Sequence, residues 1–122
     1  MLLAEDEPIS RELVTCLLEA AGLQVDTALD GLAVVAQAAR QPPDLILMDM
    51  QMAQLDGLEA TRRIRRTASG AGVPIVALTV NAFSQDQAQC LAAGMDDFVA
   101  KPVDPEVLFS VVLRWLAQSR AS

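Results

Sequence analysis

Four short apolar runs in this 122-residue chain each end in polar residues that together suit phosphoryl chemistry. The polar residues are Glu5 and Asp6, Asp49, Thr79 and Lys101. Carboxylates that gather in one place repel each other unless a cation joins them, and oxygen ligands suit Mg²⁺. Asp49 could then act as a nucleophile towards a phosphoryl group, while Thr79 and Lys101 bind its oxygens. The chemistry implied is metal-assisted phosphoryl transfer to an aspartate.

Asp49 is the residue on which this interpretation depends. It follows the continuous apolar run 45–48, which is typical of a strand buried on both faces. Open α/β sheets bind their ligands at this end of a strand. Taken alone, Asp49 is more often a helix N-cap or a loop acid. The acids, hydroxyl and lysine that end three other runs favour the functional interpretation.

The elements that must position these residues alternate along the chain. Strands are expected at 1–4, 23–28, 45–48, 74–78 and 97–100, with a helix after each. The helix after the third strand is expected from Glu59 onwards. Strand–helix alternation at this spacing predicts a parallel sheet with helices on both faces. The ends of the strands then meet at one edge, which brings the polar set together.

Capping residues and apolar spacing place the helices. Pro8 suits a first helical turn, and Gly22 and Gly94 suit helix ends. Caps are expected at Asp30, at Ser84, and at Asp104 before Pro105. The first helix has an apolar stripe at Leu13, Val14, Leu17 and Leu18, the second at Leu32, Val35 and Ala39, and the last at Val107, Leu108, Val111, Val112, Trp115 and Leu116.

Composition excludes several classes of function. The chain has no histidine, so it cannot form a histidine metal site or a Ser/His or Cys/His catalytic pair by itself. Its formal charge of −7 argues against binding nucleic acid or an anionic membrane. Four arginines lie close together in the expected third helix, and we interpret them as a solvated helix face. They are Arg62, Arg63, Arg65 and Arg66. Cys16 and Cys90 are expected to be reduced. No apolar run is long enough to span a bilayer, and no signal peptide is evident.

Five motifs together resemble a response-regulator receiver domain over essentially the whole length, 1–122. They are LLAEDE at 2–7, LILMDMQM at 45–52, DGLEA at 56–60, VALT at 76–79 and FVAKP at 98–102. The segment 81–108 is most similar to receivers of hybrid sensor histidine kinases. The resemblance implies a flavodoxin-like three-layer fold whose five-stranded parallel sheet has the order 2-1-3-4-5. Because Met1 leads almost directly into the first strand, we expect a domain excised from a longer protein.

The resemblance also implies roles for individual residues. Asp49 would accept a phosphoryl group from a phosphohistidine of a partner, and Lys101 would pair with that group. The implied Mg²⁺ ligands are Asp6, Asp49 and the backbone carbonyl of Gln51, with Glu5 acting through a bound water. The implied conformational switch involves Thr79, Phe98 and Val80.

Val80 departs from the common pattern, because the family usually has a smaller residue after the switch threonine. A stiff β-branched side chain there is expected to restrict access to Asp49.

The resemblance further implies the partners and the setting of the domain. The partner is a histidine kinase or a histidine phosphotransfer domain, and a homodimer could form through the fourth helix, fifth strand and fifth helix. The domain would contact neither nucleic acid nor membrane and would be cytoplasmic, also when attached to a membrane-anchored sensor kinase. It is not a classical enzyme and catalyses only its own phosphorylation and dephosphorylation. A full-length hybrid protein would be a histidine kinase.

Three other functions compete with this interpretation. A phosphatase of the haloacid dehalogenase type needs a second aspartate two residues after the nucleophile, where this chain has Gln51. A flavin-binding module needs a phosphate-binding loop after the first strand, but Glu5, Asp6 and Glu7 would repel a phosphate. A degenerate receiver that serves only as a protein-interaction module is opposed, though not excluded, by the intact acids, Thr79 and Lys101.

Overall fold

Five strands alternate with five helices in the computed structural model, which describes residues 1–41, 43–50, 56–67, 72–79, 84–101 and 103–121. The strands are β1 (Leu2–Ala4), β2 (Asp26–Ala28), β3 (Ile46–Asp49), β4 (Ile75–Thr79) and β5 (Asp97–Ala100). The helices are α1 (Pro8–Ala20), α2 (Gly31–Arg40), α3 (Gly57–Arg65), α4 (Ser84–Ala93) and α5 (Pro105–Ala121). The order of elements is the one that the sequence predicts.

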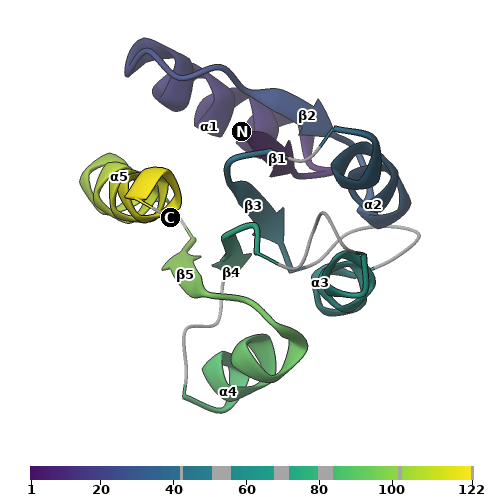
Figure 1. The fold of residues 1–122 in the computed structure, drawn as a ribbon. Coiled ribbons are helices and arrows are strands. Elements are labelled where there is room, and N and C mark those ends of the chain that lie inside the picture. Colours follow the sequence, from purple (N-terminus) through teal and green to yellow (C-terminus); the bar gives the residue numbers. More distant parts are fainter. Residues whose placement is uncertain (42, 51–55, 68–71, 80–83, 102, 122) are drawn as a thin grey trace.

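The strands form one parallel sheet in the order β2-β1-β3-β4-β5 (Figure 1), which confirms the predicted flavodoxin-like topology. β3 lies in the middle, between β1 and β4. Asp49 is in register with Leu78, and Thr79 is in register with Ala100. Parallel strands end at the same edge of the sheet, so Asp49, Thr79 and the residue after Ala100, Lys101, share that edge.

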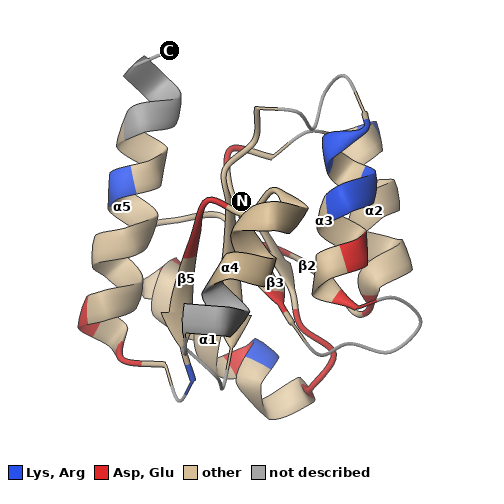
Figure 2. Ribbon diagram, turned by 90° about the horizontal axis from the view of Figure 1, so that it is seen from below, with Lys and Arg blue, Asp and Glu red and all other residues tan. Residues whose placement is uncertain are grey.

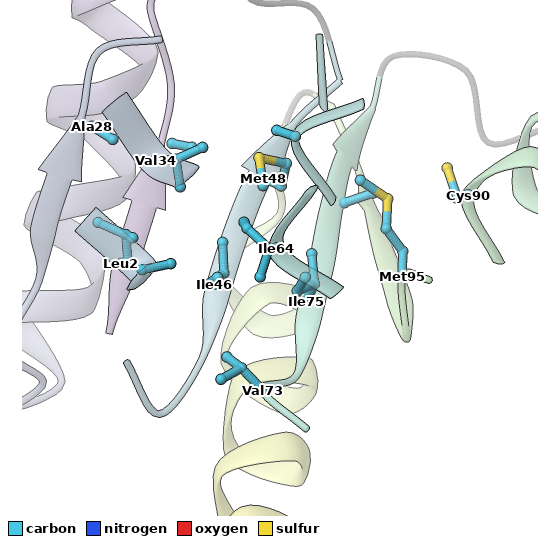
Figure 3. Close-up of a cluster of buried hydrophobic side chains, with 14 residues drawn as sticks. Leu2, Ala28, Val34, Ile46, Met48, Ile64, Val73, Ile75, Cys90 and Met95 are labelled. Atoms are coloured by element: carbon cyan, nitrogen blue, oxygen red, sulfur yellow. The ribbon is translucent and has the colours of Figure 1, made fainter. Parts of the chain in front are cut away.

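Two apolar layers fix the helices on the two faces of the sheet. On one face, Leu2, Ile46 and Ile75 are neighbours in register across three strands and pack with Met48 (Figure 3). The helix residues that cover this face come from α2, α3 and α4 and are Val34, Ala38, Ala60, Ile64 and Cys90. Each leucine or isoleucine buried in this way contributes about 1.5–3 kcal/mol. The layer therefore holds the middle of the sheet rigid beneath its functional edge.

The opposite face of the sheet carries a second apolar cluster. Its strand residues are Leu3, Leu47, Val76, Leu78 and Val99, and its helix residues are Val14 and Leu18 of α1 with Leu108, Val111 and Val112 of α5. Successive strand residues point to opposite faces, so each buried strand supplies both clusters. The three-layer arrangement that the resemblance implies is confirmed.

Local capping explains where the helices begin and end. The Asp30 carboxylate accepts a hydrogen bond from the Ala33 amide at 2.8 Å, and Asp104 accepts one from Glu106 at 2.9 Å. Both caps are predicted from the sequence. Gly94, directly after α4, has a φ of 109°, a conformation that glycine adopts without strain. α4 begins at Ser84 itself, and the predicted cap stays a prediction because the side chain of Ser84 lies outside the described part of the structure.

The predicted apolar stripe of α2 is wrong by one position. The buried residues are Gly31, Val34 and Ala38, and the side chain of Leu32 is exposed. Nearly every residue of this helix is apolar, so periodicity alone does not distinguish neighbouring stripes. β2 also begins later than predicted, at Asp26, because the preceding residues form no strand pairing.

Three further boundaries and exposures differ from the sequence prediction. α3 begins at Gly57, two residues before Glu59, because the Asp56 carboxylate caps the Glu59 amide at 2.9 Å. Leu13 of α1 and Val107 of α5 were expected in buried stripes, but both are exposed. Each sits at the edge of an otherwise confirmed stripe.

Basic residues occupy the later turns of α3 and acidic residues lie at its start (Figure 2). The arginines do not form a uniformly solvated face. Arg62 and Arg63 form exposed ion pairs with Glu59 on the same helix, as a solvated face predicts. Arg65 instead points inward. It donates to the carbonyls of Gly94 and Val73 and pairs with the carboxylate of Asp96 at 2.7 Å. Arg65 therefore links α3 to the segment just before β4 and to the turn between α4 and β5.

No disulfide joins Cys16 and Cys90, as expected for a reduced pair; Cys16 is exposed and Cys90 is buried. Among the described residues, no helix is long and apolar enough to cross a membrane.

Candidate phosphoryl-transfer site

Three carboxylates meet at the C-terminal edge of the sheet. Glu5 and Asp6 follow β1, Asp49 ends the adjacent β3, and an oxygen from each lies within 4.8 Å of the other two. Glu5 is completely buried and Asp49 is 5% exposed, whereas Asp6 is half-buried. The structure thus brings together the three acids that the sequence singles out.

Lys101 supplies the compensating charge. Its Nζ lies 2.9 Å from Glu5 Oε2 and 3.1 Å from Asp49 Oδ1, so one ammonium group bridges two of the three acids. The backbone of Lys101 is anchored separately, because its amide donates to the Thr79 carbonyl at 2.7 Å. The position of the lysine therefore depends on the pairing of β5 with β4.

The charges at this site perturb each other's protonation. Burial raises the pKa of Glu5 above its usual value, and the neighbouring Asp49 carboxylate raises it further, while Lys101 opposes both. Burial alone would lower the pKa of Lys101, but its hydrogen bonds to Glu5 and Asp49 raise it overall. The lysine is therefore held in its charged form, and negative charge on the acids remains under-compensated.

The donor set fits a divalent cation. All three converging groups offer carboxylate oxygens, the ligands that Mg²⁺ takes, and a single lysine does not balance three acids. The half-buried Asp6 leaves one side of the cluster accessible to an ion and its waters. These residues could hold Mg²⁺. Gln51, whose carbonyl is the remaining predicted ligand, lies outside the described residues.

The predicted switch residues occupy different places. Thr79 ends β4 beside the site and is half-buried. Phe98 pairs in register with Ala77, two positions before Thr79, and packs against the apolar cluster that faces α2, α3 and α4. It therefore lies away from the acidic edge. Val80 is outside the described residues, so its gating role stays a prediction.

Two residues that support the site were not predicted from the sequence. Gly57, the first residue of α3, lies so close to β3 that a Cβ there would be 2.5 Å from the carbonyl oxygen of Asp49. Arg11 of α1 donates from Nη1 to the Glu5 carbonyl at 3.1 Å. The glycine of the DGLEA motif was the sequence signal for the close approach of Gly57 to Asp49. An arginine one helical turn after the acidic residues was the signal for the contact of Arg11 with the Glu5 carbonyl.

The chain belongs to the response regulator receiver domain family, because the sequence model of that family matches residues 1–113. Among curated relatives, the sensor histidine kinase GacS of Pseudomonas protegens is 37% identical over 94% of this chain and 13% of its own length. The histidine kinase BarA of Escherichia coli K12 is 34% identical over 94% of this chain and 12% of its own length. The chain thus spans about an eighth of these relatives.

Solved structures of receiver domains have the same fold. The receiver domain of the sensor histidine kinase PA1611 of Pseudomonas aeruginosa is 42% identical, with a TM-score of 0.89 over 95% of each chain. That structure has a magnesium ion coordinated in its active-site cleft. The chemotaxis protein CheY4 of Vibrio cholerae is 29% identical, with a TM-score of 0.88 over 93% of this chain and 94% of its own. The chain is a receiver domain of two-component signalling, homologous to the phosphoacceptor domains of hybrid kinases.

Proposed function

We propose that this receiver accepts a phosphoryl group on Asp49 from a phosphohistidine of a partner protein. The observation that carries the proposal is the buried Asp49 carboxylate at the end of β3, 3.1 Å from Lys101 and close to two further acids. A carboxylate in that position lies at the edge of the sheet where its lysine and acidic neighbours gather. The likeness to receivers of histidine kinases supports the choice of donor.

The chain's own residues can carry the transfer. An Asp49 oxygen attacks the phosphorus, the phosphorus–nitrogen bond to the histidine breaks, and the imidazole nitrogen keeps the electron pair. The product is an acyl phosphate on Asp49. Lys101, now 3.1 Å from the carboxylate, moves its hydrogen bond to a phosphoryl oxygen, and the Thr79 hydroxyl donates another.

The proposed cofactor is Mg²⁺, held by Asp6, Asp49 and the Gln51 carbonyl, with Glu5 acting through water. When bound, it neutralises charge on the transferred group. Glu5 is completely buried and already pairs with Lys101, so its role is to orient the lysine as well as to add negative charge. Phosphorylation would then favour one arrangement of Thr79, Val80 and Phe98 over another.

The partner, assembly and setting follow from the same proposal. The partner is a histidine kinase or a histidine phosphotransfer domain, and residues 1–122 form one cytoplasmic receiver domain of a longer protein. A homodimer through α4, β5 and α5 is supported by the exposed apolar side chains of Leu91, Val107 and Leu113. No contact with nucleic acid or membrane is proposed.

Phosphorylation by a small acyl phosphate tests the proposal. Acetyl phosphate with Mg²⁺ should add the mass of one phosphoryl group to the wild-type protein, and a chelator should prevent this. Asp49→Asn should abolish the adduct. Asp44→Asn, which removes an exposed acid just before the buried run of β3, is the matched control and should keep it.

A wild-type protein that gains no adduct would overturn the proposal. It would favour the alternative in which the domain serves only as an interaction module. An adduct of undiminished yield in Asp49→Asn would place the chemistry on another residue.

A further inference from the structure

Arg11 reaches from the first turns of α1 back to the loop that carries two of the three acids. Its Nη1 lies 3.1 Å from the carbonyl oxygen of Glu5 and 3.5 Å from that of Asp6. The guanidinium is partly buried, so these contacts are not freely exchanged with water. One charged side chain thus contacts two successive peptide groups of the loop.

The same loop is restrained on its other sides. The Glu5 amide donates to the Ala28 carbonyl at 3.1 Å, which continues the pairing of β1 with β2. The Glu5 carboxylate accepts from the Glu7 amide at 3.2 Å and from Lys101. These bonds involve the amide and the carboxylate of Glu5, whereas Arg11 contacts the backbone carbonyls of Glu5 and Asp6. The direction of the Asp6 side chain depends on how the two peptide groups on either side of its Cα are turned, and Arg11 contacts the carbonyl of each.

We propose that Arg11 is a positioning residue for Mg²⁺ binding, which holds the Glu5–Asp6 loop so that its carboxylates converge with Asp49. The inference rests on the proposed function, because it assigns Arg11 a role in that metal site. The contacts of Arg11 go to the backbone carbonyls of Glu5 and Asp6. It acts through the backbone of these residues of the proposed metal site.

The charge of Arg11 and its positioning role have opposite effects on Mg²⁺ affinity, so an experiment can separate them. A cation close to a metal site repels the metal ion, and removing it should strengthen Mg²⁺ binding if charge were its only effect. Removing a group that orients metal ligands weakens binding, typically by tenfold or more. The sign of the change in Mg²⁺ affinity therefore identifies the role of Arg11.

The test is an Mg²⁺ titration followed by backbone amide chemical shifts. Arg11→Met should bind Mg²⁺ about tenfold more weakly than wild type. Arg11→Lys, which keeps the charge but not the length and shape of the guanidinium, should fall between them. Arg40→Met makes the same change of charge at the far end of α2, at the opposite edge of the sheet, and should bind Mg²⁺ as wild type does. The metal-free amide shifts of residues 5–7 should also change in Arg11→Met.

The possible outcomes are distinct. Unchanged or tighter Mg²⁺ binding by Arg11→Met, with normal binding by wild type, would overturn the role of Arg11 and leave the proposed function intact. Wild-type protein that binds no Mg²⁺ would overturn both. If Arg11→Met does not fold, Arg11→Lys decides, and wild-type affinity in that folded variant would contradict the inference.

Discussion

Replacing Lys101 with methionine removes the cation that holds the acidic edge of the sheet together. Methionine keeps much of the length and apolar character of the lysine stem, so the change is mainly one of charge. In the variant, Glu5 and Asp49 would face each other with no ammonium group between them. Both are almost inaccessible to water, with side chains 0% and 7% exposed.

The expected loss of stability follows from the geometry. At separations of 2.9 and 3.1 Å, each ion pair has a Coulomb attraction of about 5 kcal/mol in an effective dielectric of about 20. Desolvation of the lysine and the acids offsets much of this attraction. Removing one member of a buried pair leaves the other uncompensated and costs about 3 kcal/mol or more. We expect the free energy of unfolding of Lys101→Met in metal-free buffer to fall by about 3 kcal/mol.

Urea unfolding with and without Mg²⁺ measures the effect. Trp115 can report it, because its indole Nε1 donates to the Asp97 carboxylate at 2.9 Å and so links α5 to β5. Mg²⁺ replaces part of the lost positive charge, so it should bind the variant more tightly and stabilise it more than wild type. The stability difference between the two proteins should therefore shrink when Mg²⁺ is added. Arg63→Met removes an exposed partner of Glu59 and should change stability by less than about 1 kcal/mol.

Two results would refute this reasoning. One is a metal-free Lys101→Met protein as stable as wild type, which would mean that the acids are not forced together. The other is a stability difference that grows with Mg²⁺, which would mean that the lysine helps to hold the ion.

Two further predictions concern residues that support the site. Gly57→Ala should slow phosphorylation by acetyl phosphate, because a Cβ 2.5 Å from the Asp49 carbonyl must displace either α3 or the end of β3. Gly72→Ala is the control, because a Cβ there meets no atom within 4 Å. Equal phosphorylation rates in the two variants would contradict this expectation. The amides of Ser10 and Ile9 lower the pKa of Glu7, so its contribution to stability is present above the ordinary value of 4.5 and is lost as the pH falls through the lower folded value. Unfolding midpoints measured against pH should therefore fall less steeply below 4.5 in Glu7→Gln than in wild type or Glu12→Gln, and parallel curves would show that the cap contributes nothing.

The sequence predicts the fold well where a segment's pattern is local. The runs before Asp49 and Thr79 are apolar throughout, which is typical of a strand buried on both faces, and the structure buries them in this way. The four proposed site residues Glu5, Asp6, Asp49 and Lys101 each end a strand or lie within two residues after one. Parallel pairing then brings them together without any further information.

Sequence reasoning fails where a contact joins distant segments. Arg65 has the same local setting as Arg62 and Arg63, yet its guanidinium binds carbonyls eight and 29 positions away. Nothing near it in the chain indicates this. The stripe of α2 is misplaced for a different reason, since nearly every residue of this helix is apolar and periodicity alone does not show that Gly31 is buried while Leu32 is exposed.

Asp49 is proposed to carry the phosphoryl group, and locating that group directly in the sequence is the sharpest test. Three carboxylates lie within 4.8 Å of one another, so loss of labelling in a variant does not by itself identify the acceptor. Borohydride converts an acyl phosphate of aspartate into a distinct residue that peptide mass spectrometry can place in the sequence. After acetyl phosphate and Mg²⁺, the modified residue should be Asp49 alone, and its appearance at Asp6 or Glu5 would contradict the account.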